Sequence, residues 1–299
     1  MSKNPTTIPR RQLGRQLREL RQAVGLSLVD AARLIERGAG TLQRLEKGEN
    51  PRIRQLDIDA LCKLYGVPEE RTQQMKALAL QADRRTRPTD ESHWWARYED
   101  LIPAEFETYM SLEMAAERMI TYQPDTVPGI VQTADYAREL NRVFFTSDTA
   151  MELEQRVQVR MQRQTAITRR LSPLEVDLLI DEAALRRVAG SRRVMAGQLR
   201  RLADTPPHVK VRVLPFSGGF PLGGHVGPFV ILDFPADSAT DTPVEPSTVY
   251  VESYGSRIYY DSEIDVSRYR DAYTRIGRIA LNEADTKHLL RCVAKEYEA

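Results

Sequence analysis

Several residue types are scarce in this chain, and each scarcity excludes a class of protein. Cysteine occurs twice, as Cys62 and Cys292, which excludes a disulfide-stapled scaffold and a cysteine-rich metal site and leaves no plausible Cys–His pair. The 16 glycines and 17 prolines follow no period, so a collagen-like chain is excluded. No apolar run approaches the roughly 18 residues of a membrane span, and the first ten residues are too polar for a secretory leader. We therefore expect a cytoplasmic protein without membrane attachment.

What remains is an ordinary globular composition with an uneven distribution of charge. The chain is 41% hydrophobic and 28% charged, and its 299 residues suit about two domains. Residues 1–87 carry 18 basic and 10 acidic side chains, a balance of +8, whereas the rest carries 25 and 32, a balance of −7. A basic part followed by an acidic part indicates a nucleic-acid-facing module joined to a module with another task, although chance scatter would give a similar asymmetry.

The hydrophobic periodicity predicts a multidomain chain, with an all-α five-helix domain over residues 1–82 and a larger α+β domain over 93–299. The polar segment 83–92 is expected to be a linker between them. Helices of the second domain are expected over 94–121, 133–145, 150–169, 182–203, 265–281 and 284–297. Strands are expected at 175–180, 209–214, 229–234, 249–253 and 257–260.

Two helices of the first domain are short, adjacent and joined by a tight turn. Ser27 is a suitable N-cap for a helix over 28–35, and a second helix follows over 39–47 before Gly48 ends it. In helix-turn-helix proteins the first helix of such a pair braces against the DNA backbone. The second helix lies in the major groove, where each base pair presents a distinct pattern of donors and acceptors. This arrangement favours double-stranded DNA as a partner.

The stretch LRELRQAVGLSLVDAARLIERGAGTLQRLEKGENP, residues 17–51, resembles the Xre/Cro-repressor-like family of helix-turn-helix proteins. The matching positions are Gly25, Leu26, Ser27, Ala31, Leu42, Leu45, Glu46, Gly48 and Pro51. The resemblance implies four residues at base edges, namely Ala39, Gly40, Gln43 and Arg44. It implies four groups at DNA phosphates, namely Ser27, the backbone N–H of Leu28, Arg52 and Arg54. It also implies a structural ion pair between Arg21 and Glu46.

Two features leave the mode of DNA recognition open. Glu36 stands where this family usually has glycine in the turn, and Gly38 comes two residues later, so the sequence places the start of the second helix only to within about a residue or two. Ala39 and Gly40 offer no hydrogen-bonding side chains, so sequence discrimination would depend on DNA shape or on the spacing within a homodimer. Arg44 could pair bidentately with guanine, or could be a solvated surface charge. The two phosphate-facing arginines have the same alternative.

The second domain resembles the companion domain of actinobacterial regulators that carry an Xre-like reader, described as Scr-type antitoxin-like or WhiJ-like transcriptional regulators. The matching segments are 128–137, 156–164, 181–186, 198–199, 213–215 and 249–252. The resemblance implies a regulator that is often encoded beside a small cognate protein. An antitoxin-like protein that binds and neutralises that small protein, with DNA binding serving autoregulation, is the alternative.

The second domain shows no combination of nucleophile, base and orienting group, so we expect no enzyme, no cofactor and no metal site. Arg156, Arg160 and Arg163 stand at i, i+4 and i+7 on one helical face. That face would suit a partner protein or an anionic ligand, unless acids of the same region neutralise it. The glycine-rich loop 217–228 adds His225 to this possible partner surface, unless the loop is only a flexible hairpin.

Overall fold

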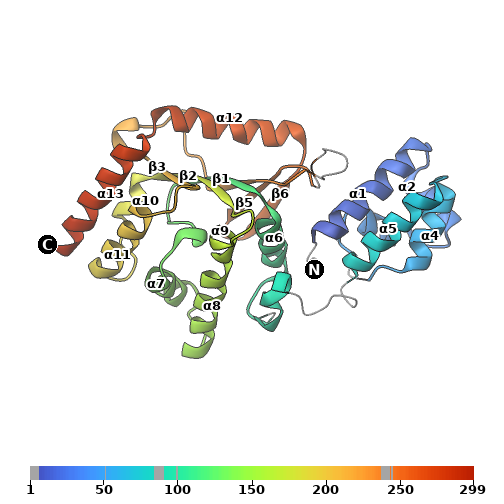
Figure 1. Cartoon of the computed structure of the whole chain (residues 1–299), viewed down its shortest axis with the longest axis horizontal. Helices are drawn as coiled ribbons and strands as arrows, with labels where there is room; N and C mark the ends of the chain where they lie inside the picture. The colour runs from blue at the N-terminus through green and yellow to red at the C-terminus, as the bar shows by residue number, and fades with distance from the viewer. Residues whose placement is uncertain (1–6, 51, 84–90, 99, 237–242, 244) are drawn as a thin grey trace. The chain divides into compact units, whose positions relative to one another are not determined.

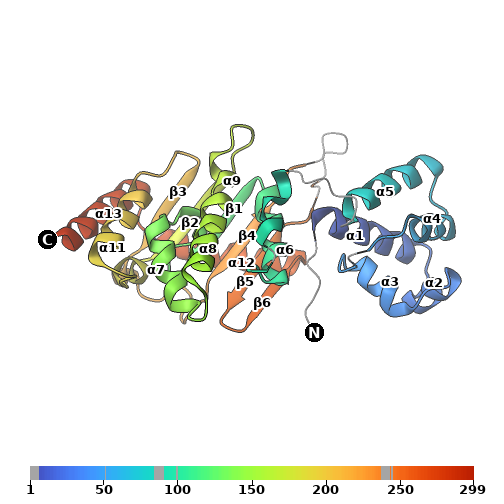
Figure 2. The ribbon, with the colours of Figure 1, turned by 90° about the horizontal axis from the view of Figure 1, so that it is seen from below.

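Five helices build the first part of the chain, as the sequence predicts. The computed structural model describes residues 7–50, 52–83, 91–98, 100–236, 243 and 245–299, and the chain divides into two compact units, 1–115 and 116–299. The five helices are α1 (Ile8–Ala23), α2 (Leu28–Leu34), α3 (Ala39–Glu46), α4 (Gln55–Leu64) and α5 (Glu69–Ala82) (Figure 2). A 3₁₀ helix (Glu91–Tyr98) and α6 (Ala104–Ala115) complete the first unit. The predicted linker over 83–92 stays a prediction, because residues 84–90 lie outside the described ranges.

One apolar core holds the five helices together. Leu13 and Leu17 of α1 are fully buried, and Leu42 and Leu45 of α3 lie in the same cluster. Each pair is spaced as one helical face requires, so burial of these side chains fixes which face of α3 turns outward. At about 25 cal/mol per Å² of apolar area, each such leucine contributes roughly 1.5–3 kcal/mol.

The second unit is built on one six-stranded mixed sheet in the order β3-β2-β1-β4-β5-β6 (Figure 1). The strands are β1 (Arg118–Gln123), β2 (Glu175–Asp181), β3 (Val209–Leu214), β4 (Phe229–Asp233), β5 (Thr248–Ser253) and β6 (Ser256–Tyr260). β1, β2 and β3 are parallel, and β4, β5 and β6 continue the sheet antiparallel to their neighbours. The all-α and α+β architectures predicted for the two parts are confirmed.

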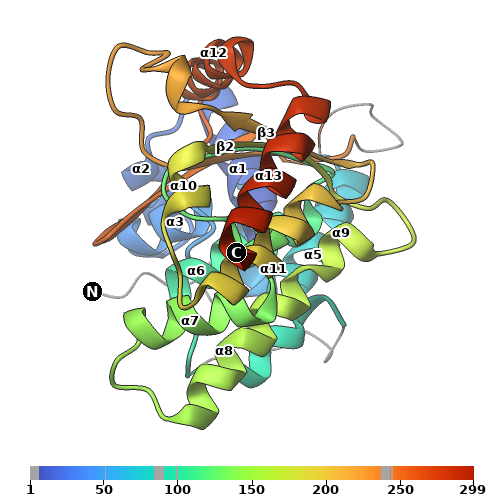
Figure 3. The ribbon, with the colours of Figure 1, turned by 90° about the vertical axis from the view of Figure 1, so that its left-hand side faces the viewer.

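Helices cover both faces of this sheet. They are α7 (Ala134–Phe144), α8 (Ala150–Arg163), α9 (Thr165–Thr168), α10 (Glu182–Arg186), α11 (Arg192–Ala203), α12 (Glu263–Ile279) and α13 (Glu283–Glu298). Figures 1 and 3 show α12 on one face and α7, α8, α11 and α13 on the other. On the α12 face, Phe229 and Ile231 of the sheet pack with Val266 and Ile276 of the helix.

The expected helix over 94–121 is wrong at its end. α6 stops at Ala115, and residues 118–123 form β1, which lies between β2 and β4. Met119, Ile120, Thr121 and Tyr122 are all buried. A strand covered on both faces reads as a continuous run of buried residues without alternation, and this short run directly follows a helical pattern. The five predicted strands of the unit are confirmed to within a residue or so.

Candidate nucleic-acid interface

Four helices of the first unit end with the same backbone motif. The residue after each C-cap is left-handed, and two amide N–H groups donate back to carbonyls of the last turn, which is the Schellman arrangement. The left-handed residues are Gly25, Glu36, Gly48 and Gly66, with φ of 69°, 55°, 70° and 68°. Between α2 and α3, Glu36 N donates to Arg33 O at 3.1 Å and Arg37 N donates to Ala32 O at 2.8 Å. This tight turn therefore holds a glutamate in a conformation that favours glycine.

We expect Glu36→Gly to stabilise the first unit by up to about 1 kcal/mol. A non-glycine residue in the left-handed region costs about 1–2 kcal/mol, and the greater freedom of glycine in the unfolded chain offsets part of that gain. Urea denaturation followed by circular dichroism measures the difference. Gly48→Ala is the reciprocal control and should lower stability. A loss of stability in Glu36→Gly would show that the glutamate side chain has a structural task.

A buried ion pair fixes α3 on α1. Arg21 Nε donates to Glu46 Oε1 at 2.7 Å and Arg21 Nη2 donates to Oε2 at 2.9 Å, so the structure brings together the two residues that the resemblance pairs. The side chains are 11% and 4% exposed. Arg21 Nη1 also donates to Leu26 O at 2.8 Å. The hydrogen bond that Arg21 donates to Glu46 raises the pKa of Arg21 despite burial, so the guanidinium stays cationic. It ties together α1, the α1–α2 turn and the end of α3.

A glycine of α1 that the sequence analysis missed allows this close approach. A Cβ on Gly14 would lie 2.6 Å from the carbonyl oxygens of both Leu45 and Glu46. Those carbonyls belong to the last turn of α3, so any side chain at position 14 would force the two helices apart. Gly14 lies in the interior of α1, where glycine costs roughly 0.5–1 kcal/mol relative to alanine. That cost is the available signal in the sequence, because a glycine kept inside a helix often marks close packing.

The outward face of α3 carries most of the predicted base-contacting residues. Gly40, Gln43 and Arg44 are exposed. Ala39 differs, because it is half-buried and packs against the core of the unit. Lys47, the C-cap of α3, is also exposed and was missed, although its helical spacing from Gln43 and Arg44 places it on the same face. The exposed groups of α3 therefore combine two cations with one amide.

The arginine of this face lies along the first turn of α3. Arg44 Nη2 approaches Thr41 Oγ1 at 3.3 Å, and a Cβ on Gly40 would lie 3.6 Å from Arg44 Nη1. The absence of a side chain at Gly40 leaves room for the guanidinium next to the helix. The hydrogen bond to Thr41 is long and exposed, so little free energy opposes its exchange for another acceptor.

The groups predicted to contact phosphates flank α3. Ser27 caps α2, accepting from Asp30 N at 3.1 Å, but its hydroxyl donates to Asp30 Oδ2 at 2.6 Å. That carboxylate puts a negative charge beside Ser27 and Leu28, the first residue of α2, which disfavours a phosphate there. Arg52 and Arg54 are exposed on the segment that leads to α4. They are therefore better placed than Ser27 to meet an anionic backbone.

Pro51 of the family motif lies outside the described residues, so its contribution is not assigned.

In the second unit, the predicted partner surface is divided. Arg156 donates to Asp148 at 2.5 Å and lies over the ring of Phe145, 3.6 Å from its centroid. Arg163 is buried and Arg160 is half-buried. The stripe therefore faces the protein more than the solvent.

Of the acids of this region, Asp148 pairs with Arg156, whereas two glutamates of α8 serve other contacts. Glu152 closes a capping box with Thr149, and Glu154 pairs with Arg138 of α7. His225 is exposed on the glycine-rich loop, whose residues Leu222 and Val226 pack with the α12 cluster. The arginines come from α8 on the other face (Figure 3). His225 and the arginines therefore do not form one surface.

The expectation that no Cys–His pair exists is wrong. Cys292 Sγ lies 3.5 Å from His288 Nε2, because the two residues are four positions apart on α13. An i, i+4 spacing within one helix is the signal in the sequence that predicts this contact.

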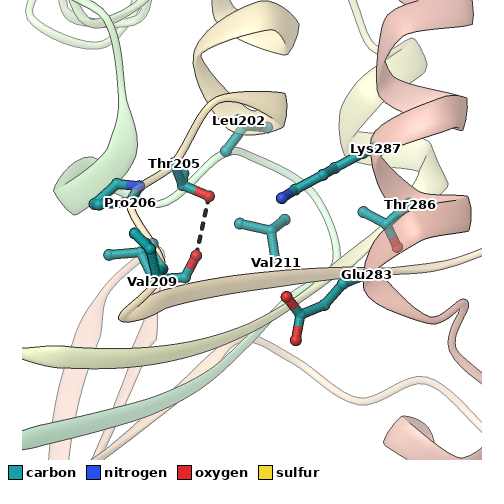
Figure 4. Close-up of a pocket in the computed structure, with 9 residues that line it drawn as sticks. Leu202, Thr205, Pro206, Val209, Val211, Glu283, Thr286 and Lys287 are labelled. Atoms are coloured by element: carbon teal, nitrogen blue, oxygen red, sulfur yellow. Dashed lines mark hydrogen bonds between the residues drawn. The ribbon is translucent and has the colours of Figure 1, made fainter.

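A small cavity lies between α11, β3 and α13 (Figure 4). Its lining includes Thr205, Val209, Thr286 and Lys287, and Thr205 Oγ1 donates to Val209 O at 2.9 Å. The volume of about 20 Å³ has room for a single water molecule rather than an organic ligand.

Over the described ranges, no helix has both the length and the apolar character needed to cross a bilayer.

Comparison with known families gives two matches. Residues 12–75 match a family model described as a helix-turn-helix domain; the match begins within α1, covers α2 to α4 and ends within α5. Residues 106–292 match a model described as a domain of unknown function (DUF5753). No curated protein and no solved structure matches the chain. The first match supports a DNA-binding regulator, with α2 and α3 as the helix pair. The second covers more than half of the sequence, so the chain belongs to the DUF5753 family and carries a helix-turn-helix domain before the DUF5753 domain.

Proposed function

We propose that this protein is a sequence-specific transcriptional regulator of the Xre type, and that a small partner protein or ligand controls it through the second unit. α3 would lie in the major groove, with Gln43 and Arg44 at base edges and Arg52 and Arg54 at phosphates. The second unit is built on a separate sheet with its own core, so it is suited to a task other than contact with DNA. Its WhiJ-like resemblance supports the regulatory part of the proposal.

The observation that carries the proposal is the held and outward-facing α3. The Arg21–Glu46 pair and the close approach at Gly14 fix the inner side of this helix. Its outer side presents a guanidinium, an amide and an ammonium group. These groups donate hydrogen bonds to the acceptor atoms of purine edges and of phosphates. Because this helix is already ordered in the free protein, its binding in a groove carries no conformational-entropy cost of folding it.

One such helix offers few side chains that can hydrogen-bond to base edges. This favours a homodimer that binds an operator with two-fold symmetry. Ala39 and Gly40 have no hydrogen-bonding side chains, so the first two positions of α3 contribute shape rather than hydrogen bonds to recognition. Two copies reading half-sites about 34–36 Å apart would supply the missing specificity through spacing. Binding would also weaken with salt, because each phosphate contact releases counterions.

Selection of genomic DNA fragments by the purified full chain tests this function. We expect enrichment of one inverted-repeat site whose half-sites are separated by about 10 base pairs or a multiple of that distance. A site beside the protein's own coding region would support autoregulation. Equal recovery of all fragments, with no sequence enriched at moderate salt, would contradict sequence-specific binding.

The antitoxin-like alternative has one observation in its favour. The last turn of α7 exposes Val143 and Phe144 to 79% and 64%, and the first turn of α8 exposes Met151 to 70%. Clustered apolar side chains on a surface often mark a protein contact. Co-expression with the small protein encoded nearby would yield a stoichiometric complex under this alternative, and its absence would argue against neutralisation as the main task.

A further inference from the structure

The segment that follows β1 is held in place by side-chain amides. Gln132 Nε2 donates to Val127 O at 2.6 Å, and Gln164 Nε2 donates to Gln132 O at 2.6 Å. Gln198, which is fully buried, accepts from Thr133 N at 2.7 Å and donates to Val131 O at 3.0 Å. The segment between β1 and α7 is therefore preorganised, because side-chain amides hold the backbone groups of Val127, Val131, Gln132 and Thr133.

This segment lies where sheets of this kind bind ligands. β1 and β2 are parallel, β1 and β4 are antiparallel, and the segment leaves the carboxyl end of β1. In open α/β sheets, ligands bind outside the carboxyl ends of parallel strands where the strand order changes direction. β1 and β2 meet this condition as a parallel pair, whereas β4 on the other side of β1 is antiparallel, so the likeness concerns the carboxyl end of β1 and not a full switch point. The position of the segment supports a binding function, and the charged side chains around it indicate the class of ligand.

Two arginines of α8 meet at this segment. Arg160 Nη1 donates to Gln132 Oε1 at 2.7 Å. A Cβ on Gly129 would lie 3.3 Å from Arg163 Nη1 and 3.7 Å from Arg160 Cδ. Both side chains therefore pass over Gly129, and a larger residue there would crowd them. Two guanidinium groups are thus brought together beside a rigid turn.

Arg160 lacks an anionic partner within the described part of the chain. Its one hydrogen bond there is to the neutral amide of Gln132, although a guanidinium has five N–H donors. Burial and the charge of Arg163 lower the pKa of Arg160 to about 10, so the group remains cationic at neutral pH. The carboxylate that favours its charge from a distance, Glu252, is already paired with Arg257 at 2.9 Å.

We propose that Arg160, with Arg163 and the Gly129–Gln132 turn, forms a binding site for the oxyanion group of a small ligand, a phosphate or a carboxylate. The remaining donors of Arg160 would hold two oxygens of that group in parallel, and Gln132 would orient the guanidinium from the other side. Bound anion would also compensate the repulsion between the two arginines. The regulatory meaning of the site depends on the proposed function, whereas anion binding does not.

Titration of the full chain with inorganic phosphate, at ionic strength held constant with sodium chloride, tests the site. We expect a saturable rise in the melting temperature and saturable heat in calorimetry. Arg160→Gln should weaken phosphate binding at least tenfold, yet should leave the melting temperature without phosphate unchanged or higher because it removes the repulsion with Arg163. Arg160→Lys, which keeps the charge and loses the planar fork, should bind with intermediate affinity.

Two variants control for nonspecific effects of charge. Arg142→Gln removes an exposed arginine of α7, and Arg71→Gln removes an exposed arginine of α5 in the helix-turn-helix unit, so both should keep the phosphate response. A parallel titration with citrate separates the two sources, because a phosphate-ester site prefers phosphate and a carboxylate site prefers citrate.

Three outcomes would overturn the proposal. They are no saturable response to either anion, an Arg160→Gln response equal to that of the wild type, and a marked fall in the melting temperature of Arg160→Gln without anion. The last would show that Arg160 serves the fold. No DNA is present in these titrations, so their failure is distinguishable from failure of the proposed DNA binding.

Discussion

Replacing Glu46 with alanine is expected to lower the free energy of unfolding of the first unit by about 3–5 kcal/mol. Arg21 is 11% exposed, and two of its guanidinium nitrogens donate to this one carboxylate. Without the carboxylate, a buried cation keeps a single acceptor, Leu26 O. The cost of an uncompensated buried charge exceeds that of most single substitutions. Loss of this magnitude is a large part of the stability of a small domain.

Denaturation of the full chain, followed by a spectroscopic signal of the first unit, measures this loss. Glu19→Ala removes an exposed glutamate of α1 and should change stability by about 0.5 kcal/mol or less. The double variant Arg21→Met/Glu46→Leu should recover most of the stability, because a well-packed apolar pair avoids the desolvation of two charges. Glu46→Ala with the stability of the wild type would show that Arg21 finds another anion and that the pair does not hold α3.

The core of the first unit was predictable because helical spacing alone determines it. Leu13 and Leu17, and Leu42 and Leu45, fall on the inner faces that their periodicity assigns. Because the buried side of α3 is known from this spacing, the residues on its exposed side are known as well. The close approach at Gly14 was not predictable in the same way, since it depends on which residue of another helix crosses at that point. The hydrophobic periodicity of a helix indicates which of its faces is buried, but it does not indicate which element packs against that face.

The same limit explains the errors in the second unit. The spacing of Arg156, Arg160 and Arg163 correctly places them on one helical side, but spacing does not reveal that this side faces the turn after β1. β1 was missed because a short buried strand and a helical segment have the same hydrophobic pattern. The Cys292–His288 contact is local, and its i, i+4 spacing on one helix was sufficient to predict it.

Arg44→Ala is expected to weaken binding to the selected operator by about 1–3 kcal/mol and to relax discrimination at one base pair. The guanidinium is exposed on the outer face of α3 and is held by one long hydrogen bond to Thr41. It is therefore available to the O6 and N7 atoms of guanine, which it matches with two parallel donors. Fluorescence anisotropy at fixed salt, with the operator and its single-base variants, measures both effects.

The ranking of the operator variants separates base reading from general attraction. Arg52→Ala removes an exposed charge outside α3, so it should weaken binding to all the variants by a similar factor and leave their order unchanged. Arg44→Lys keeps the charge but loses the two-donor fork, so it should retain affinity for phosphates and still lose the preference at one position. Because Arg44 is exposed, the stability of the unit should be unaffected in both of its variants. If Arg44→Ala preserved the order of the variants, as Arg52→Ala should, Arg44 would be a backbone-contacting residue and recognition would depend on Gln43, on the shape of the groove and on the spacing of two subunits.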